Sequence, residues 1–182
     1  MEHARFIAAV LGLCAVLLVH AAEGRRAMEL SSPAFTDGAT LPIRFARAPA
    51  GGRNLSPPLA WSAPPEGTRS LALAVVDPHP VARNWVHWLV VDIPPETRAL
   101  AEGASPGGLP PGARELVNSF GQPGYGGPQP PPGTGPHPYV FTLYALKVRH
   151  LDLPDRCRLA DFQAAIRGAV LAESRLTGYL GR

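Results

Sequence analysis

Proline and glycine interrupt this chain so often that few stretches could form a long regular helix. The sequence contains 22 proline and 19 glycine residues among 182. Proline lacks a backbone N–H and fixes one backbone angle, whereas glycine readily adopts the conformations found in turns. The pattern therefore favours short strands joined by structured loops.

The composition indicates one globular domain. Hydrophobic residues make up 46% of the chain and charged residues 17%, which is enough apolar material for a sizeable core. The formal net charge is only +3, and no basic run contains interleaved aromatic residues. We therefore do not expect a nucleic-acid-binding protein.

The first residues have the features of a secretory signal peptide. Arg5 precedes an uninterrupted apolar run of 14 residues, 6–19, which is shorter than the roughly 20 residues needed to span a bilayer. We predict a signal peptide over residues 1–21, a short leader over 22–27 and a domain over 28–182. Leu13 stands where a small residue should precede a lipidated Cys14, so we do not expect lipidation. The predicted location is periplasmic or secreted.

Removal of the signal peptide would leave Cys157 as the only cysteine. A single thiol cannot form an internal disulfide, so packing must stabilise the domain. No partner base lies near Cys157 in the sequence. We expect it to be a loop or partly buried residue and not a nucleophile.

Hydrophobic runs predict several strands and one helix. Residues 71–76 form a continuous apolar run, as expected for a strand covered on both faces, and strands are also predicted over 85–91, 139–148 and, more briefly, 41–45. Residues 159–179 carry apolar side chains with helical spacing. We interpret this last stretch as an amphipathic helix that covers one edge of the core.

Polar side chains occur at the ends or inside the predicted strands, namely Asp77, His79, His87, His137 and Tyr139. Taken singly, each has an ordinary structural role, such as turn formation or a satisfied core hydrogen bond. Together, imidazole and phenol groups beside loop amides could bind a small phosphorylated or zwitterionic group. The proline-rich loop before His137 is expected to form a stiff rim.

Four motifs in order along the chain resemble those of the phosphatidylethanolamine-binding protein (PEBP) family. They are Asn54 to Trp61, Asp77-Pro78-His79-Pro80, Trp85-Val86-His87-Trp88, and Gly127-Pro128 through His137-Pro138-Tyr139-Val140-Phe141. The family includes Raf kinase inhibitor protein and a bacterial branch, which this chain resembles more closely. The resemblance implies a mainly β fold, a β-sandwich with peripheral helices, and a small anion-binding pocket at one end.

The resemblance also implies the pocket residues. Asp77, His87, His137 and Tyr139 would line the pocket, and Pro80 and Gly127 would shape its rim. His79 stands where the family usually has a second aspartate, in a turn that is also one residue shorter. An imidazole there would make the mouth less negative, which favours anions over amines.

We therefore expect a non-catalytic binding protein for a small anionic or phosphorylated ligand, without a cofactor or metal, and either monomeric or homodimeric. The alternative is a metal-assisted hydrolase that uses Asp77, His79, His87 and His137 as ligands. A third hypothesis is a regulator that acts through protein contacts. Export argues against a cytosolic kinase as its partner, and no other protein partner is indicated.

Overall fold

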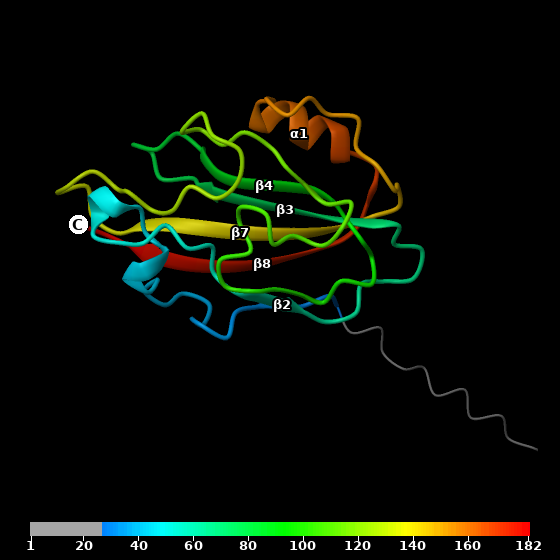
Figure 1. Ribbon diagram of the computed structural model, residues 1–182, viewed down its shortest axis with the longest axis horizontal. Coiled ribbons are helices and arrows are strands. Elements are labelled where there is room, and N and C mark those ends of the chain that lie inside the picture. Colours follow the sequence, from blue (N-terminus) through cyan, green and yellow to red (C-terminus); the bar gives the residue numbers. More distant parts are fainter. Residues whose placement is uncertain (1–26) are drawn as a thin grey trace, which may run out of the picture.

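The computed structural model describes residues 27–182, so the predicted signal peptide lies outside the described residues. The longest elements are the four strands β3, β4, β7 and β8 and the helix α1 (Figure 1). In chain order the elements are β1 (Leu30–Ser31), η1 (Ile43–Phe45), η2 (Ala48–Ala50), β2 (Leu59–Trp61), β3 (Ser70–Asp77), β4 (Trp85–Ile93), β5 (Ala99–Leu100), β6 (Arg114–Glu115), β7 (His137–Leu146), α1 (Leu159–Ile166) and β8 (Val170–Leu180).

The strands form two antiparallel sheets. The smaller sheet has the order β1-β2-β5, and the larger has the order β6-β4-β3-β7-β8. The predicted strands over 71–76, 85–91 and 139–148 are confirmed as β3, β4 and β7. The mainly β fold is therefore confirmed.

Hydrophobic side chains cover both faces of the five-stranded sheet. One face packs against the small sheet, with Leu73, Trp88 and Phe141 in the same buried cluster as Trp61. The other face packs against α1 through a second cluster that contains Leu89 and Phe162. This arrangement explains why β3 reads as a continuous hydrophobic run in the sequence.

The predicted helix over 159–179 is wrong in its extent. Only Leu159–Ile166 is helical, and the chain then turns at Gly168, whose φ is +74°, and continues as β8. In β8 the alternate residues Leu176, Gly178 and Leu180 are buried, whereas the charged residues Glu173 and Arg175 are exposed. Pairing of β8 along β7 provides hydrogen-bond partners for the backbone N–H and C=O groups of both strands. This gain outweighs the weak helical spacing of the apolar residues after Ile166.

The predicted strand over 41–45 is also wrong. Thr40 forms an isolated bridge with Tyr179, and Ile43–Phe45 is then a short 3₁₀ helix. Pro42 has no N–H to donate to a neighbouring strand, and its carbonyl accepts the Phe45 N–H at 3.0 Å. The local turn thus replaces strand pairing.

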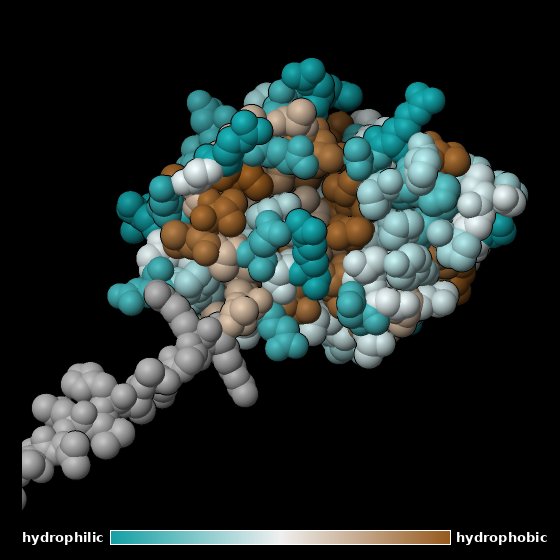
Figure 2. Space-filling view, turned by 180° about the vertical axis from the view of Figure 1, so that it is seen from behind, coloured by the Kyte–Doolittle hydropathy of each residue, from teal (hydrophilic) through white to brown (hydrophobic). Residues whose placement is uncertain are grey.

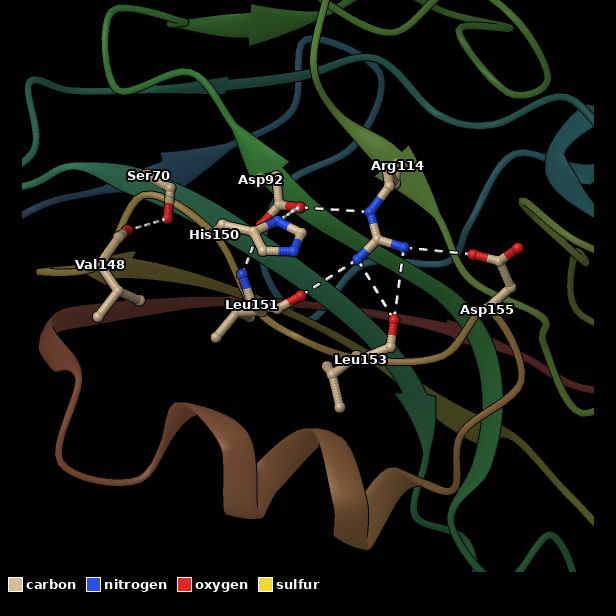
Figure 3. A network of polar contacts seen from close by, with 8 residues as sticks. All are labelled: Ser70, Asp92, Arg114, Val148, His150, Leu151, Leu153 and Asp155. Atoms are coloured by element: carbon tan, nitrogen blue, oxygen red, sulfur yellow. Dashed lines mark hydrogen bonds and ion pairs between the residues drawn. The ribbon is translucent and has the colours of Figure 1, made fainter.

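At one end of the larger sheet, Arg114 and Asp92 fasten the loop that leads to α1 (Figure 3). Asp92 accepts hydrogen bonds from Arg114 Nε at 3.3 Å, His150 Nδ1 at 2.8 Å and the Leu151 N–H at 2.9 Å. The Arg114 guanidinium also donates to the carbonyls of Leu151 and Leu153. This network lies at the C-terminal end of β4 and leaves the opposite end of the strand available for a site.

The surface mixes hydrophilic side chains with hydrophobic patches, as seen from behind in Figure 2 and as folded proteins ordinarily do. Within residues 27–182, no helix has the length and hydrophobicity needed to cross a bilayer. Cys157 lies in the loop before α1 and is half-buried, as predicted. Burial raises the pKa of its thiol, which does not favour a reactive thiolate.

Candidate functional site

Three strands bring the predicted site residues to the same end of the larger sheet. Val76, near the end of β3, lies opposite Val86 near the start of β4 and opposite Val140 near the start of β7. Because neighbouring strands are antiparallel, the end of one strand lies beside the beginnings of the next two. In Figure 1 this is the end of the sheet nearest the C-terminus.

A cavity of about 240 Å³ opens at this end of the sheet. Its lining includes four of the predicted residues, Asp77, His87, His137 and Tyr139, together with Val81, Ala82, Trp85, Phe120, Gln129, Pro130 and Pro131. The four predicted side chains are all at most 3% exposed, so they form the floor of the cavity. The cavity is smaller than most drug-sized ligand sites and suits a small head group.

A β-bulge places His87 over the floor of this cavity. Val75 pairs with Trp88 and Val76 pairs with Val86, so His87 is an extra residue in β4. Val86 packs on the α1 side of the sheet and Trp88 packs in the core between the sheets. The bulge therefore lets His87 and Trp88 face the same side, which strict alternation would not allow.

His87 is held as a neutral imidazole with a defined tautomer. Its Nδ1 lies 2.5 Å from the Gly126 carbonyl oxygen, and since a carbonyl can only accept, the proton is on Nδ1. Burial lowers the pKa of His87 to about 4, although the backbone of Gly126 and the charge of Asp77 oppose this change. At neutral pH the Nε2 atom is therefore an unprotonated hydrogen-bond acceptor.

Asp77 and His137 form a buried pair whose polar atoms are already engaged. Asp77 Oδ2 lies 2.6 Å from His137 Nδ1, and Asp77 Oδ1 accepts the His79 N–H at 2.9 Å. His137 Nε2 lies 2.9 Å from the Thr134 hydroxyl oxygen. Both side chains line the cavity, but their hydrogen-bonding capacity is directed into the protein.

The Tyr139 hydroxyl is a donor. Burial raises the pKa of Tyr139, and the charge of Asp77 raises it further, so the phenol stays protonated. The ring of Tyr139 meets the ring of His87 edge to face, with centroids 5.0 Å apart. A backbone hydrogen bond from Gln129 lowers the pKa of Tyr139, so the Gln129 N–H donates to the hydroxyl oxygen, whereas no side chain among residues 27–182 accepts the hydroxyl proton and the residue lines the cavity.

Gln129 supplies another polar atom. Its Oε1 is buried and has no hydrogen-bond partner among the described residues, and its side chain lines the cavity. Buried acceptors of this kind are uncommon, because an unpaired polar group is destabilising. The atom is therefore a candidate contact for a bound molecule.

The other three predicted site residues do not line the cavity. His79 stacks on His137, with ring centroids 3.8 Å apart, and so packs against a residue of the floor. Pro80 lies in the turn between β3 and β4. Gly127 fits against backbone, since an added Cβ would meet the Phe45 carbonyl oxygen, and its N–H donates to Asn54 Oδ1 at 2.7 Å.

Sequence reasoning missed most of the apolar wall. Trp85 and Phe120 line the cavity and pack edge to face at 5.2 Å. The sequence places Trp85 in a strand and in a family motif but does not indicate that it lines the cavity, where it is 38% exposed. Pro130 and Pro131 belong to the loop that was predicted to form a stiff rim.

The residues do not form a metal centre. Among residues 27–182, no group of three His, Cys, Asp or Glu side chains has a geometry that could hold a metal ion. His137 in particular has both ring nitrogens within hydrogen-bond distance of other side chains. The four ligands that the hydrolase hypothesis requires are therefore not arranged around one point.

Most of the chain matches a known protein family. Residues 31–181 match the family model described as phosphatidylethanolamine-binding protein. A Mycobacterium tuberculosis protein named as a lipoprotein, LppC, is 42% identical over 151 residues, which cover 83% of this chain and 71% of that protein. A UPF0098 protein of Aquifex aeolicus is 36% identical over 159 residues, which cover 87% of this chain and 91% of that protein.

A solved structure shows the same fold. The crystal structure of Escherichia coli YbcL, described as a new member of the mammalian PEBP family, matches with a TM-score of 0.80 and 32% sequence identity. The match covers 85% of this chain and 98% of YbcL. Since sequence and structure both match over most of the chain, the resemblance predicted from its motifs is confirmed and the protein belongs to the PEBP family.

Proposed function

We propose that this protein is an exported, non-catalytic binding protein for a small anionic or phosphorylated ligand. The ligand would occupy the cavity formed by Asp77, His87, His137 and Tyr139. The observation that supports this function most directly is the Tyr139 hydroxyl. It stays protonated at neutral pH and lies on the cavity floor, where it can donate a hydrogen bond to a ligand. A donor in a partly desolvated cavity binds an anionic oxygen more strongly than it binds a neutral one.

Two guanidinium groups beside the cavity support an anionic ligand. Arg47 lies over the ring of Phe120, with Cζ 4.0 Å from the ring centroid, and Arg182 donates to the carbonyl of Pro130, a wall residue. Neither forms an ion pair with an aspartate or glutamate among residues 27–182. Their charge would attract an anion to the mouth of the cavity.

A binding role agrees better with the site than a catalytic one. The Nδ1 atom of the buried base His87 donates to the Gly126 carbonyl. Among the described residues, no side chain that could act as a nucleophile lies within hydrogen-bond distance of Nε2. Asp77 and His137 are occupied by each other. The proline-rich loop formed by residues 126–136, which is predicted to be stiff, favours a preformed site over one that closes during a reaction.

Export rests on the predicted signal peptide, residues 1–21, which lies outside the described residues. The relative LppC is named as a lipoprotein, and that name indicates export of LppC itself. We propose a periplasmic or secreted location. Detection of the mature protein in a periplasmic or culture fraction, shortened by about 21 residues, would test it.

Titration calorimetry with inorganic phosphate and phosphorylethanolamine between pH 5 and 8 tests the binding function. We expect binding by the wild type and a loss of about tenfold or more in Tyr139→Phe, because the variant lacks the donor. Tyr179→Phe is the matched control, since Tyr179 is 38% exposed and lies outside the cavity. An absence of binding by the wild type would overturn the proposal.

A further inference from the structure

The arrangement of hydrogen-bond donors and acceptors around His87 restricts which anion the cavity can take. The Gly126 carbonyl holds the proton of the neutral, buried imidazole on Nδ1, and in that tautomer Nε2 is an acceptor. Nε2 has no partner among residues 27–182 and is not a buried atom left without one, so it is accessible from the cavity that His87 lines. An anion oxygen without a proton would place its lone pairs against the single lone pair of Nε2.

A second acceptor lies in the same cavity. Gln129 Oε1 is buried and has no donor among the described residues. The cavity therefore presents two acceptors that have no donor of their own, Nε2 of His87 and Oε1 of Gln129, beside the donors of the Tyr139 hydroxyl and the Gln129 side-chain amide. A complementary ligand must bring at least one N–H or O–H group of its own.

The surrounding charges do not remove this requirement. Asp77 on β3 is the carboxylate whose charge acts on His87, and it would repel a second negative charge on the ligand, whereas Arg47 lies over the ring of Phe120 and does not itself line the cavity. On β7, the imidazole of His137 is engaged by Asp77 and Thr134, and Tyr139 supplies only its single hydroxyl proton. Burial lowers the pKa of His87 to about 4, so Nε2 stays unprotonated at neutral pH.

From this geometry we propose that the cavity selects protonated oxyanions, such as acid phosphate or a phosphate monoester, in which a P–O–H group donates to His87 Nε2 while another oxygen accepts from Tyr139. Oxyanions without a proton, such as sulfate or a phosphate diester, lack the required donor. The inference rests on the proposed function and makes it more specific, because it distinguishes a monoester from the diester found in a phospholipid.

Calorimetry at pH 5.5 with three probes tests the inference. Phosphate and sulfate have nearly the same size, and phosphate and dimethyl phosphate carry the same single charge at this pH. We expect phosphate to bind at least about tenfold more tightly than either of the others, which is the effect of losing one hydrogen bond to a charged group. Neither size nor charge alone could produce both differences.

The His87→Ala variant removes the acceptor, so its phosphate affinity should fall and the three affinities should approach one another. His150→Ala is the matched control, because His150 lies in the network at the opposite end of the sheet and its side chain is 63% exposed. Thermal unfolding shows whether each variant folds, and the comparison of the three probes on the wild type does not depend on the variants.

If sulfate and dimethyl phosphate bind to the wild type as tightly as phosphate, the selection of protonated oxyanions is refuted and the binding function stands. If no probe binds, both proposals fail.

Discussion

The carboxylate of Asp77 lies 2.6 Å from Nδ1 of His137, and both side chains are almost completely buried. Asp77 also accepts the His79 N–H, and His137 also contacts the Thr134 hydroxyl. The pair thus connects the end of β3, the turn that follows it and the loop before β7. Its role in the proposed site is to fix the floor of the cavity.

Replacement of Asp77 should destabilise the fold. In Asp77→Ala the His79 N–H and the His137 ring lose their acceptor in a buried site, and we expect the free energy of unfolding to fall by about 3 kcal/mol. Urea unfolding at pH 7 measures the change. Asp155→Ala is the control: its carboxylate is 79% exposed and pairs with Arg114 at the surface, so its loss should be below about 1 kcal/mol. Equal losses in the two variants would contradict this role.

Stability should decrease as the pH falls through the range in which His87 titrates. The pKa of His87 is about 4 in the folded protein and 6.5 for an ordinary histidine, so the unfolded chain binds more protons between these values. Stability is therefore complete above pH 6.5 and lost progressively toward pH 4, by roughly 2–3 kcal/mol between pH 7.5 and 4.5.

Urea unfolding of the wild type and of His87→Asn at pH 7.5 and pH 4.5 isolates the contribution of His87 to the pH dependence of stability. The asparagine amide can still donate to the Gly126 carbonyl, but it does not titrate. Other titrating groups affect both proteins, so the difference between their pH dependences reports on His87. Identical pH dependences would show that His87 is not held neutral in the folded state.

Gly127 should not tolerate a side chain. A Cβ at this position would meet the Phe45 carbonyl oxygen at 2.0 Å, which is backbone and cannot move aside easily. We expect Gly127→Ala to lose more than about 2 kcal/mol of stability, in line with severe overpacking. Gly133→Ala, in the same loop, has no atom within 4 Å of the added Cβ but has a φ of +78°, and should lose only about 1 kcal/mol. Thermal unfolding compares the two, and a Gly127→Ala variant as stable as the control would contradict the close packing.

The network at the other end of β4 predicts unequal effects of two substitutions at Asp92. The carboxylate accepts three hydrogen bonds, and the residue has a φ of +60°. Asp92→Ala loses these bonds and strains the backbone, so we expect a loss of about 3 kcal/mol. Asparagine tolerates this conformation and can still accept the Leu151 N–H, so Asp92→Asn should lose only about 1 kcal/mol. Chemical unfolding measures both, and equal losses would exclude a role for the conformation and the retained bond.

The sequence predicted the strands of the larger sheet well because their hydrophobic runs are long and bounded by proline or glycine. β3, β4 and β7 lie close to the predicted positions. The helix prediction extended too far because Ala172, Ser174 and Gly178 weaken the alternation that marks β8. Apolar residues at helical spacing then gave the stronger local pattern.

The family motifs in the sequence identified the four charged or polar residues of the cavity floor, because those residues stand at strand ends that an antiparallel sheet brings together. They did not identify Trp85, Phe120 or Gln129, whose roles depend on how loops fold over the sheet. Nor did they show that Asp77 and His137 satisfy each other, since the two residues lie 60 positions apart.

By itself, the sequence determined the hydrophobic pattern, the breaks made by proline and glycine, and the types of side chain available to a site. Only the tertiary structure decided which of their polar atoms stay free. The β-bulge at His87 depends on the pairing of β3 with β4, and the bond from Nδ1 depends on the position of the Gly126 carbonyl. Both arise from contacts between distant segments, and hydrogen bonds of this kind leave no local signal in the sequence.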